Sequence, residues 1–155
     1  MSNRLFILCE KTSRWAAAVR PALRAADAQL IETRSIAGCQ AALDQSPTSL
    51  VAIEVTLANL EAAVEYLKRL GPQYPRAAAI ALMTAELLPA APLVREAGAI
   101  DVATSVLDAP RLARLARRHF QLVPQPALTA QEFVNERLSW PAHAVNSTSD
   151  RQGIG

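Results

Sequence analysis

Short runs of apolar residues alternate along the chain with longer stretches whose apolar residues recur at helical spacing. A run that is apolar throughout, such as Leu50–Ile53, is typical of a strand buried on both faces of a sheet. Strands that alternate with helices indicate successive βα units and a parallel sheet. The predicted strands are Leu5–Cys9, Gln29–Thr33, Leu50–Ile53, Ala77–Met83 and Ile100–Ser105.

Capping and helix-breaking residues mark the ends of the helices that follow these strands. Pro21 has no amide hydrogen to donate, so we expect it to kink or split the first helix. Gly71 followed by Pro72 should end the third helix. Further starts and stops are predicted at Glu10–Ser13, Ser35, Ser46–Pro47, Gly98 and Asp108.

The succession of about five βα units predicts an α/β fold, a flavodoxin-like doubly wound domain. Its parallel five-stranded sheet is expected to have the strand order 2-1-3-4-5. We place this domain at residues 1–122 and a C-terminal tail at residues 123–155, because the pattern changes at Pro124-Gln-Pro126.

A capping box from Thr129 to Glu132 predicts a short amphipathic helix within the tail, followed by a polar, disordered end. A helix this short needs a surface to hold it. It docks either on its own domain or in a groove on a partner protein. Its candidate partner-binding residues are Phe133, Val134, Leu138 and Trp140.

The composition fits one ordinary globular domain. Of the 155 residues, 51% are hydrophobic and 19% are charged, which excludes a wholly disordered chain. The formal net charge of +2 is too small to indicate nucleic acid or a membrane as the partner. No apolar run approaches the roughly 18–20 residues of a membrane span. Cys9 and Cys39 are expected to be buried, reduced thiols, which predicts a cytoplasmic protein.

Polar side chains follow several of the predicted strands. In an open doubly wound sheet, ligands bind outside the carboxyl ends of the strands, where the strand order reverses. We therefore expect the side chains at these ends to converge at one edge of the sheet. They are Cys9, Glu10, Glu54, Thr84 and Ser105.

These positions, together with the stretches Leu50–Val55, Ile80–Ala85 and Gly98–Asp101, resemble the receiver domain of bacterial two-component response regulators. The resemblance covers about residues 4 to 122 and implies the same fold. In that family an acidic pair and an aspartate bind magnesium, and the aspartate takes a phosphoryl group. A hydroxyl and a lysine then contact that group. Glu10 and Thr84 match the family's pattern.

Three residues depart from the family's pattern. Cys9 replaces the first acid, Glu54 the phosphorylated aspartate, and Ser105 the lysine. Glutamate carries its carboxylate one methylene farther out, and a misplacement of about 1 Å at a reacting atom can cost about 100-fold in rate. Sulfur is a poor ligand for magnesium, and losing the lysine removes a fixed positive charge. We expect a degenerate phosphoacceptor pocket with no catalytic residue, metal or cofactor.

The acids and the hydroxyl of this pocket also have ordinary interpretations. Glu54 is either a permanent mimic of the phosphorylated state or a strand-end carboxylate, solvated or bonded to nearby backbone amides. Glu10 can be a solvated acid, and Thr84 a hydroxyl that binds the following loop. We predict a pseudo-receiver that binds a protein in bacterial signalling. The alternative is a receiver that still responds to phosphorylation or Mg²⁺ through Glu10 and Glu54.

The last predicted helix is basic. Arg111, Arg114 and Arg118 share one of its faces, which is either a solvated surface or a contact surface. The resemblance favours contact, since the fifth strand and fifth helix commonly meet partners in receiver domains. We predict protein binding or a homodimer through Val102 and these arginines. Nucleic-acid binding through this helix is a weaker alternative, because no recognition motif accompanies the charge.

Overall fold

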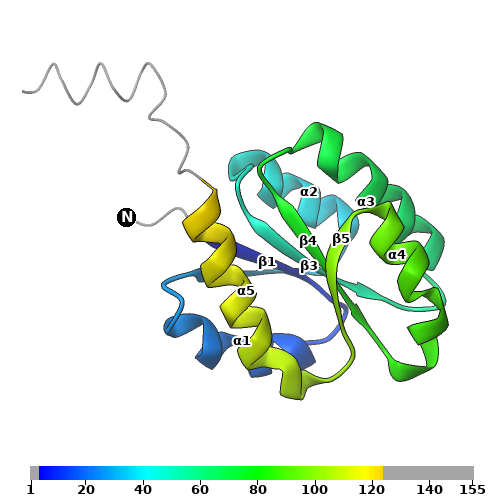
Figure 1. The fold of residues 1–155 in the computed structure, drawn as a ribbon, viewed down its shortest axis with the longest axis horizontal. Coiled ribbons are helices and arrows are strands. Elements are labelled where there is room, and N and C mark those ends of the chain that lie inside the picture. Colours follow the sequence, from blue (N-terminus) through cyan, green and yellow to red (C-terminus); the bar gives the residue numbers. More distant parts are fainter. Residues whose placement is uncertain (1–3, 124–155) are drawn as a thin grey trace, which may run out of the picture. The chain divides into compact units, whose positions relative to one another are not determined.

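Five parallel strands form one sheet in the computed structural model, which describes residues 4–123 (Figure 1). The strands are β1 (Leu5–Cys9), β2 (Gln29–Thr33), β3 (Leu50–Val55), β4 (Ala78–Met83) and β5 (Ala99–Ala103). Their order, β2-β1-β3-β4-β5, confirms the predicted doubly wound fold. The central strands β1, β3 and β4 are almost entirely buried, which explains their continuous apolar runs.

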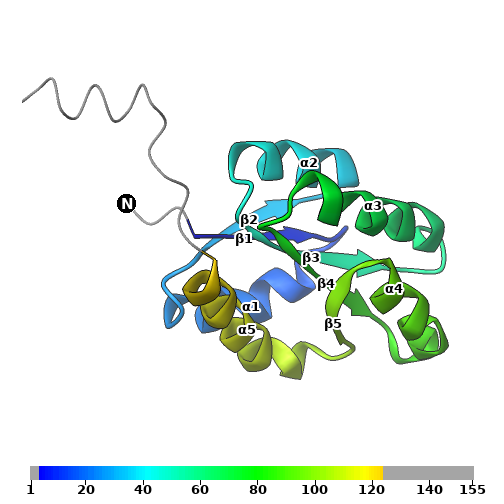
Figure 2. The ribbon, with the colours of Figure 1, turned by 45° about the horizontal axis from the view of Figure 1, so that its top comes forward.

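Within the same residues, five α-helices cover the two faces of the sheet, and two 3₁₀ segments precede the last two helices. The helices are α1 (Arg14–Arg24), α2 (Ile36–Gln45), α3 (Leu60–Gln73), α4 (Ala91–Ala97) and α5 (Ala109–Leu122), and the 3₁₀ segments are η1 (Ala85–Ala90) and η2 (Val106–Asp108). Helices α1 and α5 pack side by side on one face, while α2, α3 and α4 cover the other (Figure 2). Each face of the sheet therefore has its own apolar core.

Two helices continue through prolines at which the sequence predicts an interruption or an end. Helix α1 continues through Pro21, which is exposed, because Val19 and Leu23 on the same helix are fully buried against the sheet. Burying such side chains contributes about 1.5–3 kcal/mol each, which offsets the cost of about 3 kcal/mol for an interior proline. Helix α3 likewise continues through Gly71 and Pro72. The predicted split of α1 at Pro21 and the predicted stop of α3 at Gly71 and Pro72 were wrong.

Two strand ends also differ from the prediction. Strand β3 extends two residues farther, because Glu54 and Val55 continue the pairing with Leu82 and Met83 of β4. Glu54 therefore lies within a strand rather than after one. Strand β5 ends before the predicted Ser105, which belongs to the following loop instead.

Gly98 ends α4 as the sequence predicts, and its backbone requires glycine. Its φ of 133° is one that side chains with a Cβ rarely adopt. A Cβ at this position would also lie 3.2 Å from the carbonyl oxygen of Leu67 in α3. Glycine thus permits both the turn into β5 and the close approach of α3 to α4.

The tail that the sequence predicts at residues 123–155 lies outside the described residues except for Val123. The hypotheses for Phe133, Val134, Leu138 and Trp140, and the domain boundary itself, remain predictions. Among residues 4–123, no helix is both long enough and apolar enough to cross a membrane.

His119 joins the end of α5 to the segment that precedes β3. The ring is 8% exposed, and its Nε2–H donates to the carbonyl oxygen of Thr48 at 2.9 Å. Burial lowers the pKa of His119 below its ordinary value of 6.5, and the bond to the carbonyl offsets this only in part. The folded protein therefore favours the neutral ring.

The free energy of unfolding should fall as the pH is lowered through and below about 6.5, because the unfolded chain then binds a proton more readily than the folded one. The loss should level off once the pH is below the lowered pKa of the folded state. Urea unfolding at a series of pH values checks this, with His119→Gln as the comparison. The variant should lose much of the pH dependence between neutral and mildly acidic conditions. An unchanged pH dependence would assign the effect to other groups.

Candidate functional site

The carboxylate of Glu10 is buried beneath the first turn of α1. Glu10 is 2% exposed, and its two carboxylate oxygens accept the N–H groups of Trp15 at 3.0 Å and Ala16 at 2.9 Å. These are among the amides that a helix leaves without partners at its start. Ser13, at the N-cap position, makes no side-chain capping bond, so Glu10 performs that role. The interpretation of Glu10 as a solvated acid was wrong.

Arg34 holds the loop that joins β1 to α1. Its guanidinium donates to the carbonyl oxygens of Glu10 at 3.2 Å and Thr12 at 2.8 Å, and to the hydroxyl of Ser13 at 2.9 Å. It also forms an ion pair with Glu32 at 3.5 Å. The sequence did not point to this role, because the contacts depend on a loop more than twenty residues away.

Glu54 turns its carboxylate toward the same loop. Its Oε1 accepts the backbone N–H of Lys11 at 3.4 Å, a long and therefore weak hydrogen bond. The carbonyl oxygen of Glu54 accepts the side-chain amide of Asn59 at 2.8 Å, and Asn59 in turn closes the turn with Thr56. This geometry fits the interpretation of Glu54 as a carboxylate bonded to nearby backbone.

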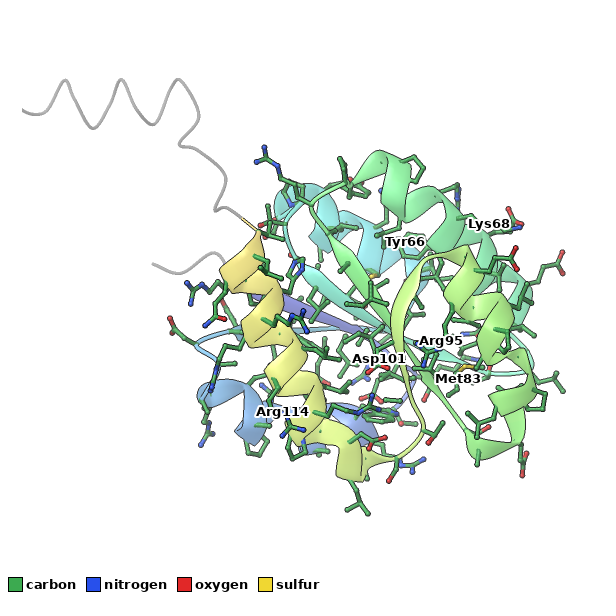
Figure 3. All side chains as sticks on the ribbon, viewed as in Figure 1. Tyr66, Lys68, Met83, Arg95, Asp101 and Arg114 are labelled. Atoms are coloured by element: carbon green, nitrogen blue, oxygen red, sulfur yellow. The ribbon has the colours of Figure 1, made fainter. Side chains whose placement is uncertain are left out.

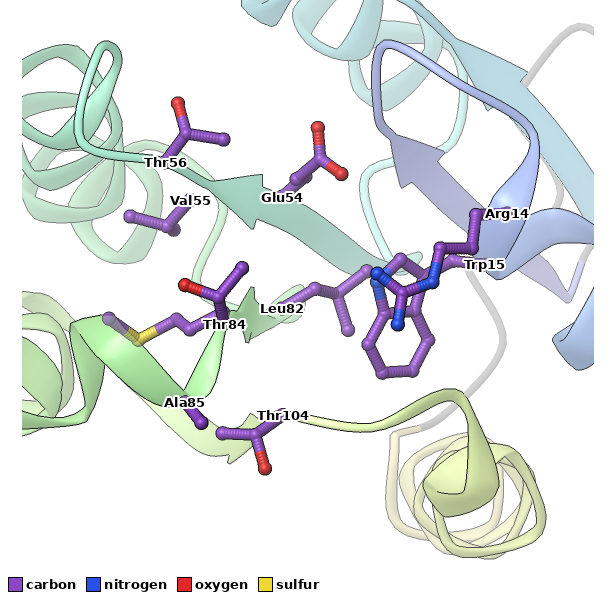
Figure 4. A pocket seen from close by; sticks show the side chains of 10 residues that line it. Arg14, Trp15, Glu54, Val55, Thr56, Leu82, Thr84, Ala85 and Thr104 are labelled. Atoms are coloured by element: carbon purple, nitrogen blue, oxygen red, sulfur yellow. The ribbon is translucent and has the colours of Figure 1, made fainter.

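Two small pockets adjoin Glu54 at the carboxyl edge of the sheet. One, of about 200 Å³, places Glu54, Thr84 and Thr104 at the ends of three neighbouring strands, with Arg14 and Trp15 across from them (Figure 4). The other, of about 260 Å³, lies beside the loop between β1 and α1. Its lining includes Cys9, Glu10, Lys11, Arg34 and Asn59. Glu54 and Thr84 thus share a pocket, and Glu54 shares the second one with Cys9 and Glu10.

Ser105 is used as a helix cap and is absent from the residues that line either pocket. Its hydroxyl accepts the N–H of Leu107 at 3.2 Å, while the carboxylate of Asp108 accepts the N–H of Ser105 at 3.4 Å. Thr104, one residue earlier, takes the place at the pocket that the sequence suggested for Ser105.

Cys9 behaves as a core residue. Its side chain is 6% exposed, and burial raises the pKa of its thiol, with a smaller contribution from the nearby charge of Glu54. The thiol is therefore protonated and a poor nucleophile or metal ligand at neutral pH.

The residues at this edge do not fit a magnesium ion, which the resemblance to receiver domains would place there. Both oxygens of Glu10 already accept amide N–H groups, and Cys9 offers a protonated sulfur. Magnesium is bound through oxygen ligands, usually including one or two carboxylates. Of the five predicted pocket residues, Glu54 alone supplies a carboxylate that is not already bonded to α1. Within residues 4–123, no cluster of three or more acidic, histidine or cysteine side chains is arranged to hold a metal.

The predicted partner face around β5 and α5 is only partly exposed. Val102 is 8% exposed and packs in the core beneath α3 and α4, so its prediction as a surface residue was wrong. Arg111 forms ion pairs with Asp101 and Asp108, and Asp101 also pairs with Arg95 of α4 at 3.7 Å (Figure 3). These ion pairs join α4 to α5 across the edge strand.

Arg114 and Arg118 lie on the exposed side of α5, as predicted. Ile100, which the sequence analysis did not select, is the exposed apolar residue of β5 at 51%. Ile100 falls at the register shift where Ala99 and Asp101 pair with consecutive residues of β4, so alternation along the sequence gave no signal for its exposure.

No protein-family model and no curated protein matches the sequence of the chain. Several solved structures match its fold. The CheY-like protein TadZ from Pseudomonas aeruginosa superposes with a TM-score of 0.65 at 20% identity, over 81% of this chain and 100% of that one. The chain has the fold of a receiver domain.

Other receiver structures agree with this assignment. A response regulator from Thermotoga maritima superposes with a TM-score of 0.64 at 15% identity, over 76% of the receiver-like chain and 98% of its own. A protein described as an atypical orphan response regulator with a phosphorylation-independent regulatory mechanism gives a TM-score of 0.62 at 15% identity. The match covers 79% of the receiver-like chain and 99% of the orphan regulator's chain. At these identities the likeness establishes the fold.

Glu10→Ala should lower the free energy of unfolding by about 1–3 kcal/mol, because it removes a helix cap and leaves two amides of α1 without their acceptors. Glu54→Ala, the matched substitution, should cost less than about 1 kcal/mol, since its bond to Lys11 is long and partly exposed. Urea unfolding of both variants measures the difference. Equal losses would show that Glu54 anchors the edge as strongly as Glu10 does.

Proposed function

We propose that this receiver-like domain is a pseudo-receiver, which has lost phosphotransfer and works by binding another protein. The observation that carries the proposal is the use of Glu10, whose two carboxylate oxygens accept N–H groups of α1. An acid that is 2% exposed and oriented by two amides is poorly placed to bind a hydrated magnesium ion. Phosphotransfer in receiver domains depends on that ion, as the resemblance implies.

The other pocket residues support the same proposal. Glu54 stands in place of the acceptor aspartate, with its carboxylate one methylene farther out and bonded to the Lys11 amide. Thr104, which lines the pocket where the sequence suggested Ser105, carries no positive charge, and the hydroxyl of Ser105 serves as a cap. A transferring phosphoryl group would therefore lack the metal and the lysine of the family's pattern, both of which stabilise developing charge.

The similar structures bear on the biological setting. One of them is described as regulating independently of phosphorylation, which supports the same possibility for this chain. On this basis we place the domain in the bacterial cytoplasm as a signalling module that is not an enzyme and takes no cofactor. Its partner on this proposal is a protein rather than a nucleic acid.

Incubation with acetyl phosphate and Mg²⁺ should leave the mass of the protein unchanged, because the acceptor and the lysine of the family's pattern are both replaced. Intact-protein mass spectrometry checks this, with a phosphorylatable receiver domain as the positive control. A gain of one phosphoryl group that disappears in Glu54→Gln would contradict the proposal.

The alternative function is a response to phosphorylation or Mg²⁺ through Glu10 and Glu54, and the shared pocket of Glu54 and Thr84 is the observation that favours it. Magnesium with beryllium fluoride imitates a phosphorylated carboxylate. Chemical-shift changes confined to these residues on its addition would support the alternative, and an unchanged spectrum supports the pseudo-receiver.

We further propose that β5 and the adjoining α4 form the homodimer contact. Ile100 of β5 and Leu93 of α4 are 51% and 45% exposed, and an exposed edge strand is a ready site of association. The ion pair of Asp101 with Arg95 lies on the same two elements and supplies a polar rim.

Ile100→Glu should shift the receiver-like chain from dimer toward monomer, because it places a charge where an apolar contact is expected. Sedimentation velocity over a range of concentrations measures the change. Leu122→Glu, at the exposed end of α5, is the matched control and should leave association unchanged. Sedimentation as a monomer before any substitution, or equal effects of both variants, would contradict this contact.

A further inference from the structure

The two helices on one face of the sheet carry only positive charge. Helices α1 and α5 contact each other along that face, and they hold seven arginines, three in α1 and four in α5, with no acidic residue in either helix. On the other face, each of α2, α3 and α4 contains at least one carboxylate. Unbalanced positive charge is therefore concentrated on the face of α1 and α5, which a net charge of +2 conceals.

Three of these arginines already have partners. Arg20 pairs with Glu32 at 2.7 Å, Arg111 pairs with Asp101 and Asp108, and Arg117 donates to the carbonyl oxygen of Ala25 at 2.9 Å. Within residues 4–123, the guanidinium groups of the other four make no hydrogen bond or ion pair, and all four residues are exposed. They are Arg14, Arg24, Arg114 and Arg118, and we call them the arginine surface.

Two arginines of this surface stand one helical turn apart. Arg114 and Arg118 lie on the side of α5 opposite its buried residues, where their like charges repel each other. Neither finds a carboxylate among the described residues to relieve that repulsion. A ligand with two anionic groups spaced by one helical turn would do so. The guanidinium group binds a carboxylate through two parallel hydrogen bonds, which a lysine ammonium cannot do.

The solvent-facing side of α1 carries small apolar side chains between its arginines. Between Arg14 and Arg24, its exposed residues are Ala17 and Pro21, apart from the paired Arg20, and the exposed Ala25 follows Arg24 directly. Small apolar side chains allow another helix to approach closely and gain little from contact with a phosphate backbone. This combination of an apolar strip with flanking arginines fits an amphipathic protein helix better than it fits nucleic acid.

We infer that the arginine surface binds an acidic amphipathic helix of a partner protein, with carboxylates one turn apart facing Arg114 and Arg118. This inference rests on the proposed function, whose partner it describes by chemistry and whose contact it places on α1 and α5. The β5 contact uses other residues, Ile100 of β5 and Leu93 of α4, so the two proposed surfaces share none. The domain then has two distinct surfaces, one apolar at β5 and one cationic.

A fluorescein-labelled helical peptide of alanine and glutamate, with glutamate at every fourth position, tests the inference on the full chain. Fluorescence anisotropy should show binding that weakens as salt rises. Arg114→Gln with Arg118→Gln should weaken it about tenfold or more, by loss of two bidentate contacts. Lys68→Gln with Arg69→Gln on α3, the matched control on the other face, should leave it unchanged.

Absence of peptide binding, or equal loss in the control variant, would overturn the inference. Tighter binding to a DNA duplex of about 20 base pairs or to anionic vesicles, lost in the Arg114 and Arg118 variant, would also overturn it and assign the surface to phosphate groups instead. These outcomes are independent of the acetyl phosphate experiment. A chain that is phosphorylated but binds the peptide refutes the pseudo-receiver, whereas an unphosphorylated chain that ignores the peptide refutes the arginine surface.

Discussion

The buried carboxylate of Glu10 under the first turn of α1 is the constraint on which the carboxyl edge of this sheet depends. A carboxylate is costly to bury unless hydrogen bonds and nearby positive charge compensate it. The free amides of Trp15 and Ala16 and the positive end of the helix supply both. Because both oxygens point into the helix, the residue that most resembles a metal ligand in the sequence has become part of the scaffold.

The neighbouring polar groups follow the same rule, in that each is bonded to the protein's own backbone. Arg34 binds carbonyl oxygens of the loop after β1, Glu54 reaches the amide of Lys11, and Ser105 caps η2. A site that holds a ligand needs groups whose bonding capacity points into the pocket. In this chain most of these polar groups are bonded to the protein's own backbone. The pocket that remains beside Thr84 and Thr104 is small.

The fold could be predicted from the sequence because it rests on strong local signals. The continuous apolar runs of β1, β3 and β4 and the glycine stop at Gly98 were all visible. The continuation of α1 through Pro21 was not, because it depends on burial against a sheet that the local sequence does not describe. The strand ends shifted for a related reason, since β3 continues as far as β4 offers it a partner.

Most members of the candidate site were predictable, with Ser105 in place of Thr104 as the exception, but its geometry was not. Sequence placed Cys9, Glu10, Glu54 and Thr84 at one edge, and the pockets do bring them together. It could not show which way Glu10 points, because a glutamate three residues before an N-cap is not a standard capping position. Val102 was misplaced because helices cover both faces of this sheet, so that even a residue of the edge strand is buried where a helix lies over it.

A regulatory switch requires two states that a signal favours unequally. In a receiver domain the signal is a charge added at the carboxyl edge, and the surrounding groups must be free to rearrange around it. In this chain those groups are held by bonds to the backbone of α1 and of the loops after β1 and β5. On the proposed function no such charge is added at Glu54, so that the edge would keep one arrangement, and binding by the outer surfaces would depend on partner concentration and ionic strength. Arg14 is the residue that adjoins both regions, since it lines the pocket beside Glu54 and begins the arginine surface. A partner that neutralises Arg14 would therefore alter the electrostatic field at the pocket beside Glu54. Binding at the arginine surface would then affect the pocket, which is the reverse of the direction in a receiver domain.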